Sequence, residues 1–214
     1  MARTGAGGNR TRRKHAVRDY KRGIILKAAR RVFAARGFEG ASLRAIARAA
    51  GYTPPALYFH FASKEDIYGE LLALSLLRLD RAVRAAAAAA GPARRLAGGA
   101  FGFFDHYRSN PREFELGLLL FGGSKPLGMR SAQSAELKAR LDAVLDELER
   151  GLRELGASPA DAARNATALL AFMIGLLLLA QGPRGRSFGV NARVQLQQYL
   201  ERMTAAAAAA QAGT

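Results

Sequence analysis

Apolar residues recur three and four residues apart along almost the whole chain, and this spacing limits the possible folds more than any other feature. A helix repeats every 3.6 residues, so the spacing gathers apolar side chains on one helical face, whereas a half-buried strand needs strict alternation. The sequence contains no long alternating stretch. It therefore predicts an all-α protein.

Two short helices near residue 50 are marked by capping residues. Ser42 can cap a helix over residues 43–50, and Thr53 can cap a second one over residues 54–61. Three residues that include Gly51 join the two, which is the size and spacing of a helix-turn-helix. In that motif the second helix enters the major groove of DNA with its amino-terminal residues leading.

Glycine, proline and further capping residues divide the rest of the chain into longer helices. Their predicted ranges are 20–36, 64–90, 93–109, 112–121, 131–155, 159–180 and 191–208. The alanine runs at 85–90 and 205–210 are interpreted as low-complexity helix extensions without an assigned function.

The positive charge is concentrated at the amino-terminal end. The formal net charge of the chain is +16, and residues 1–64 hold 15 Lys and Arg against two acidic residues. Residues 65–214 hold 18 basic against 15 acidic residues, which is close to balance. Such an asymmetry indicates a polyanionic partner for the amino-terminal part, with double-stranded DNA the first candidate and an anionic membrane surface the second.

Pro54 and Pro55 open the second short helix, the one expected to read DNA. First-turn amides have no partner inside a helix, so proline is tolerated there and presets the backbone angle. Proline also offers no donor to a purine edge, but it can pack against a thymine methyl group. We therefore predict a preference for thymine at these positions.

Polar and basic side chains around the two helices are expected to hold the phosphate backbone. Leu57, Phe59 and Phe61 are predicted to lie in the core instead. The run RTRRK at residues 10–14 is either a DNA-contacting arm or a solvated tail. The complete predicted DNA-binding set is Ser42, Arg44, Arg48, Thr53, Pro54, Pro55, Tyr58, His60 and Lys64.

The stretch ARRVFAARGFEGASLRAIARAAGYTPPALYFHFASKEDIYGELL resembles the DNA-binding domain of the tetracycline-repressor (TetR) family of bacterial transcription regulators. The resemblance implies a homodimeric repressor that a small molecule releases from its operator. It places Ser42, Arg44, Thr53, Pro54, Pro55, Tyr58, His60 and Lys64 at DNA-contacting positions. Many family members carry a polar residue or glycine where Pro54 and Pro55 stand, so base reading is expected to differ.

Three segments follow from these observations. Residues 1–18 are expected to form a flexible basic arm, residues 19–66 the helix-turn-helix domain, and residues 67–214 a helical bundle for effector binding and dimerisation. The apolar helix over residues 166–180, which we expect to be buried on several sides, would pair with the last helix in a four-helix dimer interface. The core of a monomer is the alternative interpretation of this helix.

Aromatic residues in the carboxy-terminal part suggest a cavity for an apolar or aromatic effector, although ordinary core packing is the alternative for each residue. The predicted lining is Phe101, Phe104, Tyr107, Phe114, Leu118, Phe121, Leu141, Leu145 and Phe172.

Other classes of function find less support in the sequence. We expect no catalysis, no cofactor and no metal, because no nucleophile–base pair or phosphate loop occurs and the three histidines are scattered. The chain lacks cysteine, and its most apolar stretch is shorter than the ~20 residues of a membrane span, so a cytoplasmic, nucleoid-associated protein is expected. The rival functions are a sequence-indifferent architectural DNA binder, a membrane-surface protein and, last, an enzyme built on a helical bundle.

Overall fold

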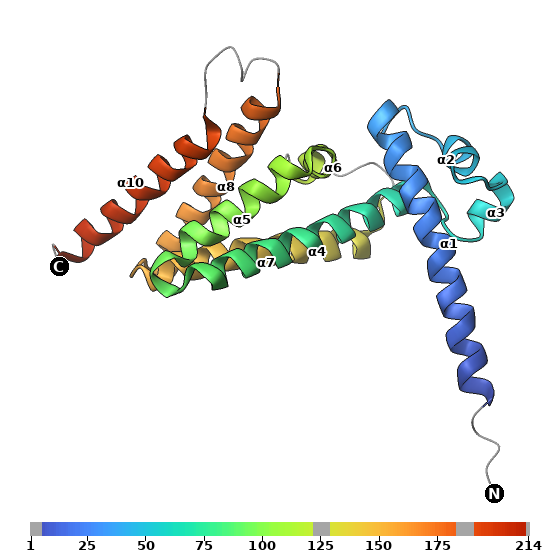
Figure 1. Cartoon of the computed structure of the whole chain (residues 1–214), viewed down its shortest axis with the longest axis horizontal. Coiled ribbons are helices and arrows are strands. Elements are labelled where there is room, and N and C mark those ends of the chain that lie inside the picture. The colour runs from blue at the N-terminus through green and yellow to red at the C-terminus, as the bar shows by residue number, and fades with distance from the viewer. Residues whose placement is uncertain (1–5, 122–128, 183–190, 213–214) are drawn as a thin grey trace, which may run out of the picture. The chain divides into compact units, whose positions relative to one another are not determined.

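The computed structural model describes residues 6–121, 129–182 and 191–212, and within these ranges the chain forms helices and turns without a strand (Figure 1). The all-α prediction is confirmed. The elements are α1 (Ala6–Arg36), α2 (Leu43–Ala50), α3 (Pro54–Tyr58), α4 (Lys64–Ala90), a 3₁₀ turn (Pro92–Arg94), α5 (Arg95–Ser109), α6 (Pro111–Phe121), α7 (Ser131–Glu154), α8 (Pro159–Gln181) and α10 (Ala192–Ala212).

The chain divides into two compact units. The amino-terminal unit comprises the chain up to Leu71 and a segment that ends at Ser131, and the carboxy-terminal unit comprises the remainder.

Apolar residues of α1 form the centre of the amino-terminal unit, where α1 packs on α2. Ile25, Ala29 and Phe33 are buried, as their spacing predicts. The ring of Tyr68 at the start of α4 meets the ring of Phe33 edge-on, with 5.3 Å between the centroids. Burial raises the pKa of Tyr68 to about 12, so its hydroxyl stays neutral.

The structure corrects the predicted beginning of α1. The helix starts at Ala6, whereas the sequence analysis expected a flexible arm up to residue 18. Arginine, lysine and alanine are good helix formers and no proline interrupts this segment, so the helix can propagate past its packed part. All residues from Thr11 to Lys21 are exposed.

Glycines allow α5 to approach α4 closely in the carboxy-terminal unit. A β-carbon built on Gly98 would lie 2.6 Å from the carbonyl oxygen of Ala86, and one built on Gly102 would lie 2.9 Å from that of Ala82. Such distances leave no room for a side chain. The alanine run at 85–90, to which the sequence analysis assigned no function, therefore contributes to the contact between two helices.

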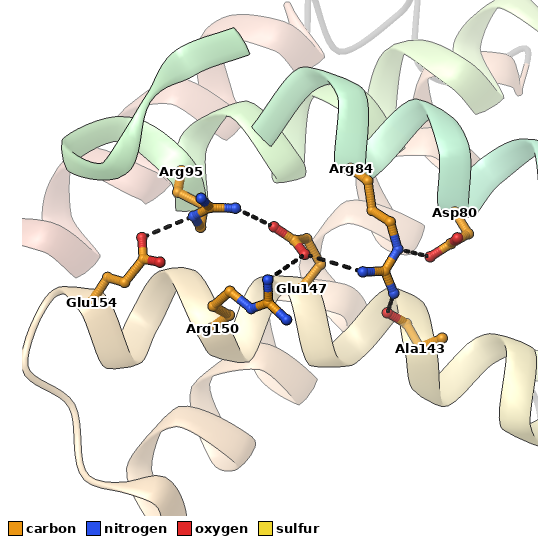
Figure 2. A network of polar contacts seen from close by, with 7 residues as sticks. All are labelled: Asp80, Arg84, Arg95, Ala143, Glu147, Arg150 and Glu154. Carbon is orange, nitrogen blue, oxygen red and sulfur yellow. Dashed lines mark hydrogen bonds and ion pairs between the residues drawn. The ribbon is translucent and has the colours of Figure 1, made fainter. Parts of the chain in front are cut away.

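A buried carboxylate, Glu147 of α7, lies among three arginines (Figure 2). Arg95 donates to it at 2.8 Å, and the guanidinium groups of Arg84 and Arg150 lie 3.6 and 3.9 Å away. Arg95 also donates to Glu154 at 2.9 Å. These contacts join α4, α5 and α7, and the several donors compensate the buried charge.

A second buried carboxylate, Glu113 of α6, is held by α4 and α5. Ser75 donates to it at 2.9 Å and Arg78 at 2.7 Å, and the Nε2 atom of His106 lies 3.5 Å away. Burial alone would raise the pKa of Glu113, but the nearby His106 and the hydrogen bonds from Arg78 and Ser75 outweigh burial and lower it to about 2.

Candidate nucleic-acid interface

The turn between α2 and α3 depends on one glycine. Gly51 adopts φ 73°, a left-handed conformation that favours glycine, and the N–H of Tyr52 donates to the carbonyl of Ala47 at 2.9 Å. Ile46 and Leu57 anchor the two helices in the core with fully buried side chains. The predicted helix-turn-helix is therefore present, although α3 ends at Tyr58 instead of residue 61.

The amino-terminal end of α3 offers few backbone donors. Pro54 and Pro55 occupy its first two positions and have no N–H, and the N–H of Ala56 donates to the hydroxyl oxygen of Thr53 at 3.4 Å. Ser42 caps α2 in the same way through the N–H of Ala45. Thr53 and Ser42 thus act as the predicted caps, and the front of α3 presents mainly apolar surface.

Most residues of the predicted DNA-binding set lie on the surface of the amino-terminal unit. Ser42, Arg44, Arg48, Thr53, Pro55 and Tyr58 are exposed, and Pro54 and His60 are half-buried. Their contacts with DNA remain predictions, but their side chains are accessible to a partner.

The ring of Phe59 is the clearest difference from the sequence analysis. It is 88% exposed, whereas we expected it in the core with Leu57 and Phe61, which are indeed buried. Because α3 ends at Tyr58, Phe59 falls on the turn and no longer follows the helical period of Leu57. An exposed phenyl ring beside Tyr58 enlarges the apolar surface around α3.

Arg22 of α1 positions the end of α3, a role that sequence reasoning missed. Its guanidinium donates to the carbonyl of His60 at 2.6 Å, lies 4.1 Å from the ring centroid of Phe61 and pairs with Glu70. These contacts fix the turn after α3 against α1 and α4. In the sequence, Arg22 is one of many basic residues in this helix, and nothing there distinguishes it from the others.

Lys64 also points toward the protein. Its ammonium group donates to the carbonyl of Phe38 at 3.0 Å and lies 4.4 Å from the centre of that ring. A phosphate contact by Lys64 would have to replace these interactions. Its predicted DNA contact remains a prediction, beside a structural role that the sequence did not show.

The electrostatic environment of His60 is positive. Burial lowers its pKa below 6.5, and the charges of Lys21, Arg22 and Arg18 lower it further. The imidazole is therefore neutral at pH 7 and can donate one ring N–H. A phosphate placed here would meet one neutral donor and a basic face of α1.

The residues predicted to line an effector cavity have different environments. Phe104, Tyr107 and Phe114 are fully buried, and burial and then Glu113 raise the pKa of Tyr107. Phe172 stacks on Tyr199 at 4.1 Å. Phe121 lies outside the residues whose side chains are described. The half-buried remainder of the set comprises Phe101, Leu118, Leu141 and Leu145.

A groove of about 630 Å³ opens in the carboxy-terminal unit between the end of α4, the start of α5, the segment after α7 and α10. From the predicted set it includes Phe101. Leu96, Leu155 and Leu200 add apolar surface, and the polar and charged lining consists of Arg94, Gln197, Glu201 and Thr204. Elsewhere, no group of three or more His, Asp or Glu residues that could hold a metal occurs among the described residues.

Comparison with known proteins shows that the helix-turn-helix segment of this chain matches a known family. Residues 25–71 match the family model described as bacterial regulatory proteins of the tetR family. The HTH-type transcriptional activator FasR of Mycolicibacterium smegmatis is 38% identical over 112 residues, which is 52% of this chain and 51% of that protein. The HTH-type transcriptional repressor KstR2 of Mycobacterium tuberculosis is 46% identical over 52 residues, 24% of this chain and 26% of that protein. The chain thus spans about half the length of FasR and less of KstR2.

Solved structures share the fold over most of the chain. The TetR family transcriptional regulator PfmR from Thermus thermophilus superposes with a TM-score of 0.66 over 84% of this chain and 96% of that one, at 24% identity. The fatty acid degradation regulator FadR from Bacillus halodurans superposes with a TM-score of 0.64 over 86% of this chain and 94% of that one, at 16% identity. These likenesses show a common architecture. Residues 25–71 thus form a DNA-binding domain of the TetR family of bacterial regulatory proteins, and the chain shares the fold of the TetR-family structures.

Proposed function

We propose that this chain is a DNA-binding transcriptional regulator that places α3 in the major groove. The observation that carries the proposal is the capped α2–turn–α3 unit, whose exposed surface is surrounded by basic residues. The match of residues 25–71 to the family supports it. Phosphate contacts would come from exposed side chains such as Arg44, Arg48 and Tyr58.

The surface of α3 favours apolar base reading. Its front lacks free N–H donors, and the neighbouring surface contains Pro55, Tyr58 and Phe59. Such groups can contact a thymine methyl but cannot make the bidentate hydrogen bonds by which arginine reads guanine. We therefore propose thymine-rich contact positions. Pro54→Arg would test this, because unchanged base preference in that variant would show that position 54 does not face bases.

A second copy of the chain would cover an apolar face in the carboxy-terminal unit. One face of α8 is exposed, although the sequence analysis expected this helix to be buried on several sides. Its exposed residues Ala168, Ala171 and Leu178 are three and seven residues apart and therefore lie on the same side of the helix. Val194 of α10, a helix that packs on α8, is also exposed. We propose that these faces pair in a homodimer.

The length of α8 bears on the membrane alternative. The helix has 23 residues, close to the predicted range 159–180, and by length and composition it could cross a membrane, whereas the sequence analysis judged its apolar stretch too short for a span. A single helix of this kind is weak evidence for a span, because core helices of soluble proteins have the same character. Its packing on α5 and α10 is consistent with the dimer proposal.

Regulation by a small molecule is the remaining part of the proposal. The groove beside Phe101 has the size of a ligand site and a mainly apolar lining, which suits an apolar or aromatic effector. Effector binding would favour a dimer whose two α3 helices no longer match a palindromic operator, so the chain would act as a repressor. KstR2 is named a repressor and FasR an activator. Expression of a reporter gene behind the operator would show whether this chain represses or activates transcription.

Selection of binding sites from a random duplex pool, at near-physiological salt, tests the proposal. A palindrome with half-sites about one helical turn apart, ~34–36 Å, is expected for a two-fold symmetric reader. Binding that depends on salt but enriches no sequence would refute it in favour of an architectural DNA binder.

A further inference from the structure

The part of α1 that precedes the packed core is exposed in the described part of the chain. Every side chain from Thr11 to Lys21 is exposed, including Val17 at 47% and Tyr20 at 73%. Figure 1 shows α1 continuing well past α2 and α3 toward the amino terminus. An unpacked helical segment of this length is marginally stable in water, so a binding partner would stabilise it.

Three basic residues occupy one face of this segment. Lys14, Arg18 and Lys21 stand four and three residues apart, so their side chains project from the same side of the helix. All three are exposed, and none of them forms an ion pair within the described part of the chain. We call these three residues the basic row.

The basic row leads to the end of α3. Arg22 follows Arg18 by four residues on the same face, and its guanidinium donates directly to the carbonyl of His60 at 2.6 Å. The row therefore begins next to the turn after α3 and runs away from it along α1, rising about 1.5 Å per residue. The charges of Lys21 and Arg18 are close enough to contribute to the lowered pKa of His60.

Several other charged residues of α1 lie away from the basic row. Arg12, Arg13 and Lys27 lie on the other side of the helix, together with the acidic Asp19. The run RTRRK is thus divided by the helix into residues that continue the row and residues that do not. An irregular arm would not make this distinction.

We propose that the basic row, Lys14, Arg18 and Lys21, binds the phosphate backbone of DNA beside the major-groove site of α3. The proposal rests on the proposed DNA-binding function and adds a second contact surface to it. Evenly spaced, unpaired cations on an exposed helix complement the regular charge of a duplex, and they carry no base-reading geometry. The contact would therefore strengthen binding to every sequence by a similar factor.

The salt dependence of binding measures these contacts directly. Each phosphate contact contributes about 0.9 to the slope of log K against log salt concentration. Neutralising the row in the triple variant Lys14→Gln, Arg18→Gln, Lys21→Gln should lower the slope by about 2–3 and weaken binding roughly a hundredfold near physiological salt. Fluorescence anisotropy with a selected duplex and with a mixed-sequence duplex would show losses of similar size.

A matched control removes the same charge from the other side of α1. The triple variant Arg12→Gln, Arg13→Gln, Lys27→Gln has the same net charge as the row variant, and the affected residues are equally exposed. Its slope should change by less than about 1. Circular dichroism of both variants checks that the helix content is kept.

Two results would overturn the proposal. Equal changes of slope in the two variants would show a general effect of net charge, and an unchanged slope in the row variant would show that the row does not contact phosphate. Failure of the proposed function itself has a different signature, because the unmodified chain would then bind neither duplex.

Discussion

Replacing Gly151 with alanine tests the packing between α7 and α5 in the carboxy-terminal unit. Gly151 is buried inside α7, and a β-carbon built on it would lie 2.8 Å from both the N and Cα atoms of Leu96. These are backbone atoms, so the contact cannot be relieved by turning a side chain. Gly151→Ala therefore forces α5 and α7 apart or strains them.

Two opposing effects set the magnitude of the change. Alanine is favoured over glycine inside a helix by about 1 kcal/mol. Overpacking a well-filled contact costs about 1–3 kcal/mol, and the rigid backbone of Leu96 places this site toward the upper end. The free energy of unfolding should fall by about 1–2 kcal/mol, which lowers Tm by roughly 2–8 °C in a chain of this size.

Gly23→Ala provides the matched control. Gly23 also lies inside a helix, but no atom outside its neighbourhood lies within 4 Å of the built β-carbon. Only the helix preference remains, so this variant should gain about 0.5–1 kcal/mol. Both variants would be measured by urea and thermal unfolding, followed by circular dichroism at one fixed protein concentration. Equal or greater stability of the Gly151 variant would refute the close approach of α7 to Leu96.

Three further predictions concern the two units. Phe59→Ala should weaken DNA binding about tenfold, since an apolar contact of about 1.4 kcal/mol is lost, while Tm barely changes; a clear fall in Tm would contradict the exposed position. A phosphate beside His60 would raise its lowered pKa, so DNA affinity should rise as the pH falls through the range in which His60 gains a proton, and His60→Gln should remove this dependence in anisotropy titrations. Glu113→Gln should destabilise the chain by about 3 kcal/mol at neutral pH, because the pKa of Glu113 is about 2 instead of 4.5. The stabilisation is present above pH ~4.5 and lost toward pH 2, so a difference that persists at low pH in urea unfolding would count against this assignment.

Helix boundaries were predictable where the chain carries local signals. Ser42, Thr53 and Gly51 act through their own side chains or backbone angles, so their effect is readable from a few residues. The fold class and the helix-turn-helix follow from the same local rules. The start of α1 was not predictable, because highly charged residues suit both a solvated tail and a helix.

Features that depend on packing were harder to predict. Phe59 and Phe61 differ by two positions, yet one is exposed and the other buried, because α3 ends at Tyr58. The aromatic residues of α5 and α6 showed that the region is apolar, but sequence spacing cannot distinguish a filled core from a cavity wall. Phe104 and Phe114 are fully buried, and Phe101 borders the groove.

The close approach of α5 to α4 changes how the alanine repeat at 85–90 should tolerate mutation. Ala86 and Ala90 face Gly98, where a larger side chain would collide with α5, and Ala87 is fully buried. The other three members, Ala85, Ala88 and Ala89, are exposed. The alanine run therefore contains two interleaved sets of sites. The exposed positions tolerate substitution by lysine, glutamate or glutamine, and the positions that face α5 or the core accept only small residues. Methods of sequence comparison that discard such repeats as uninformative would discard part of the core of this domain.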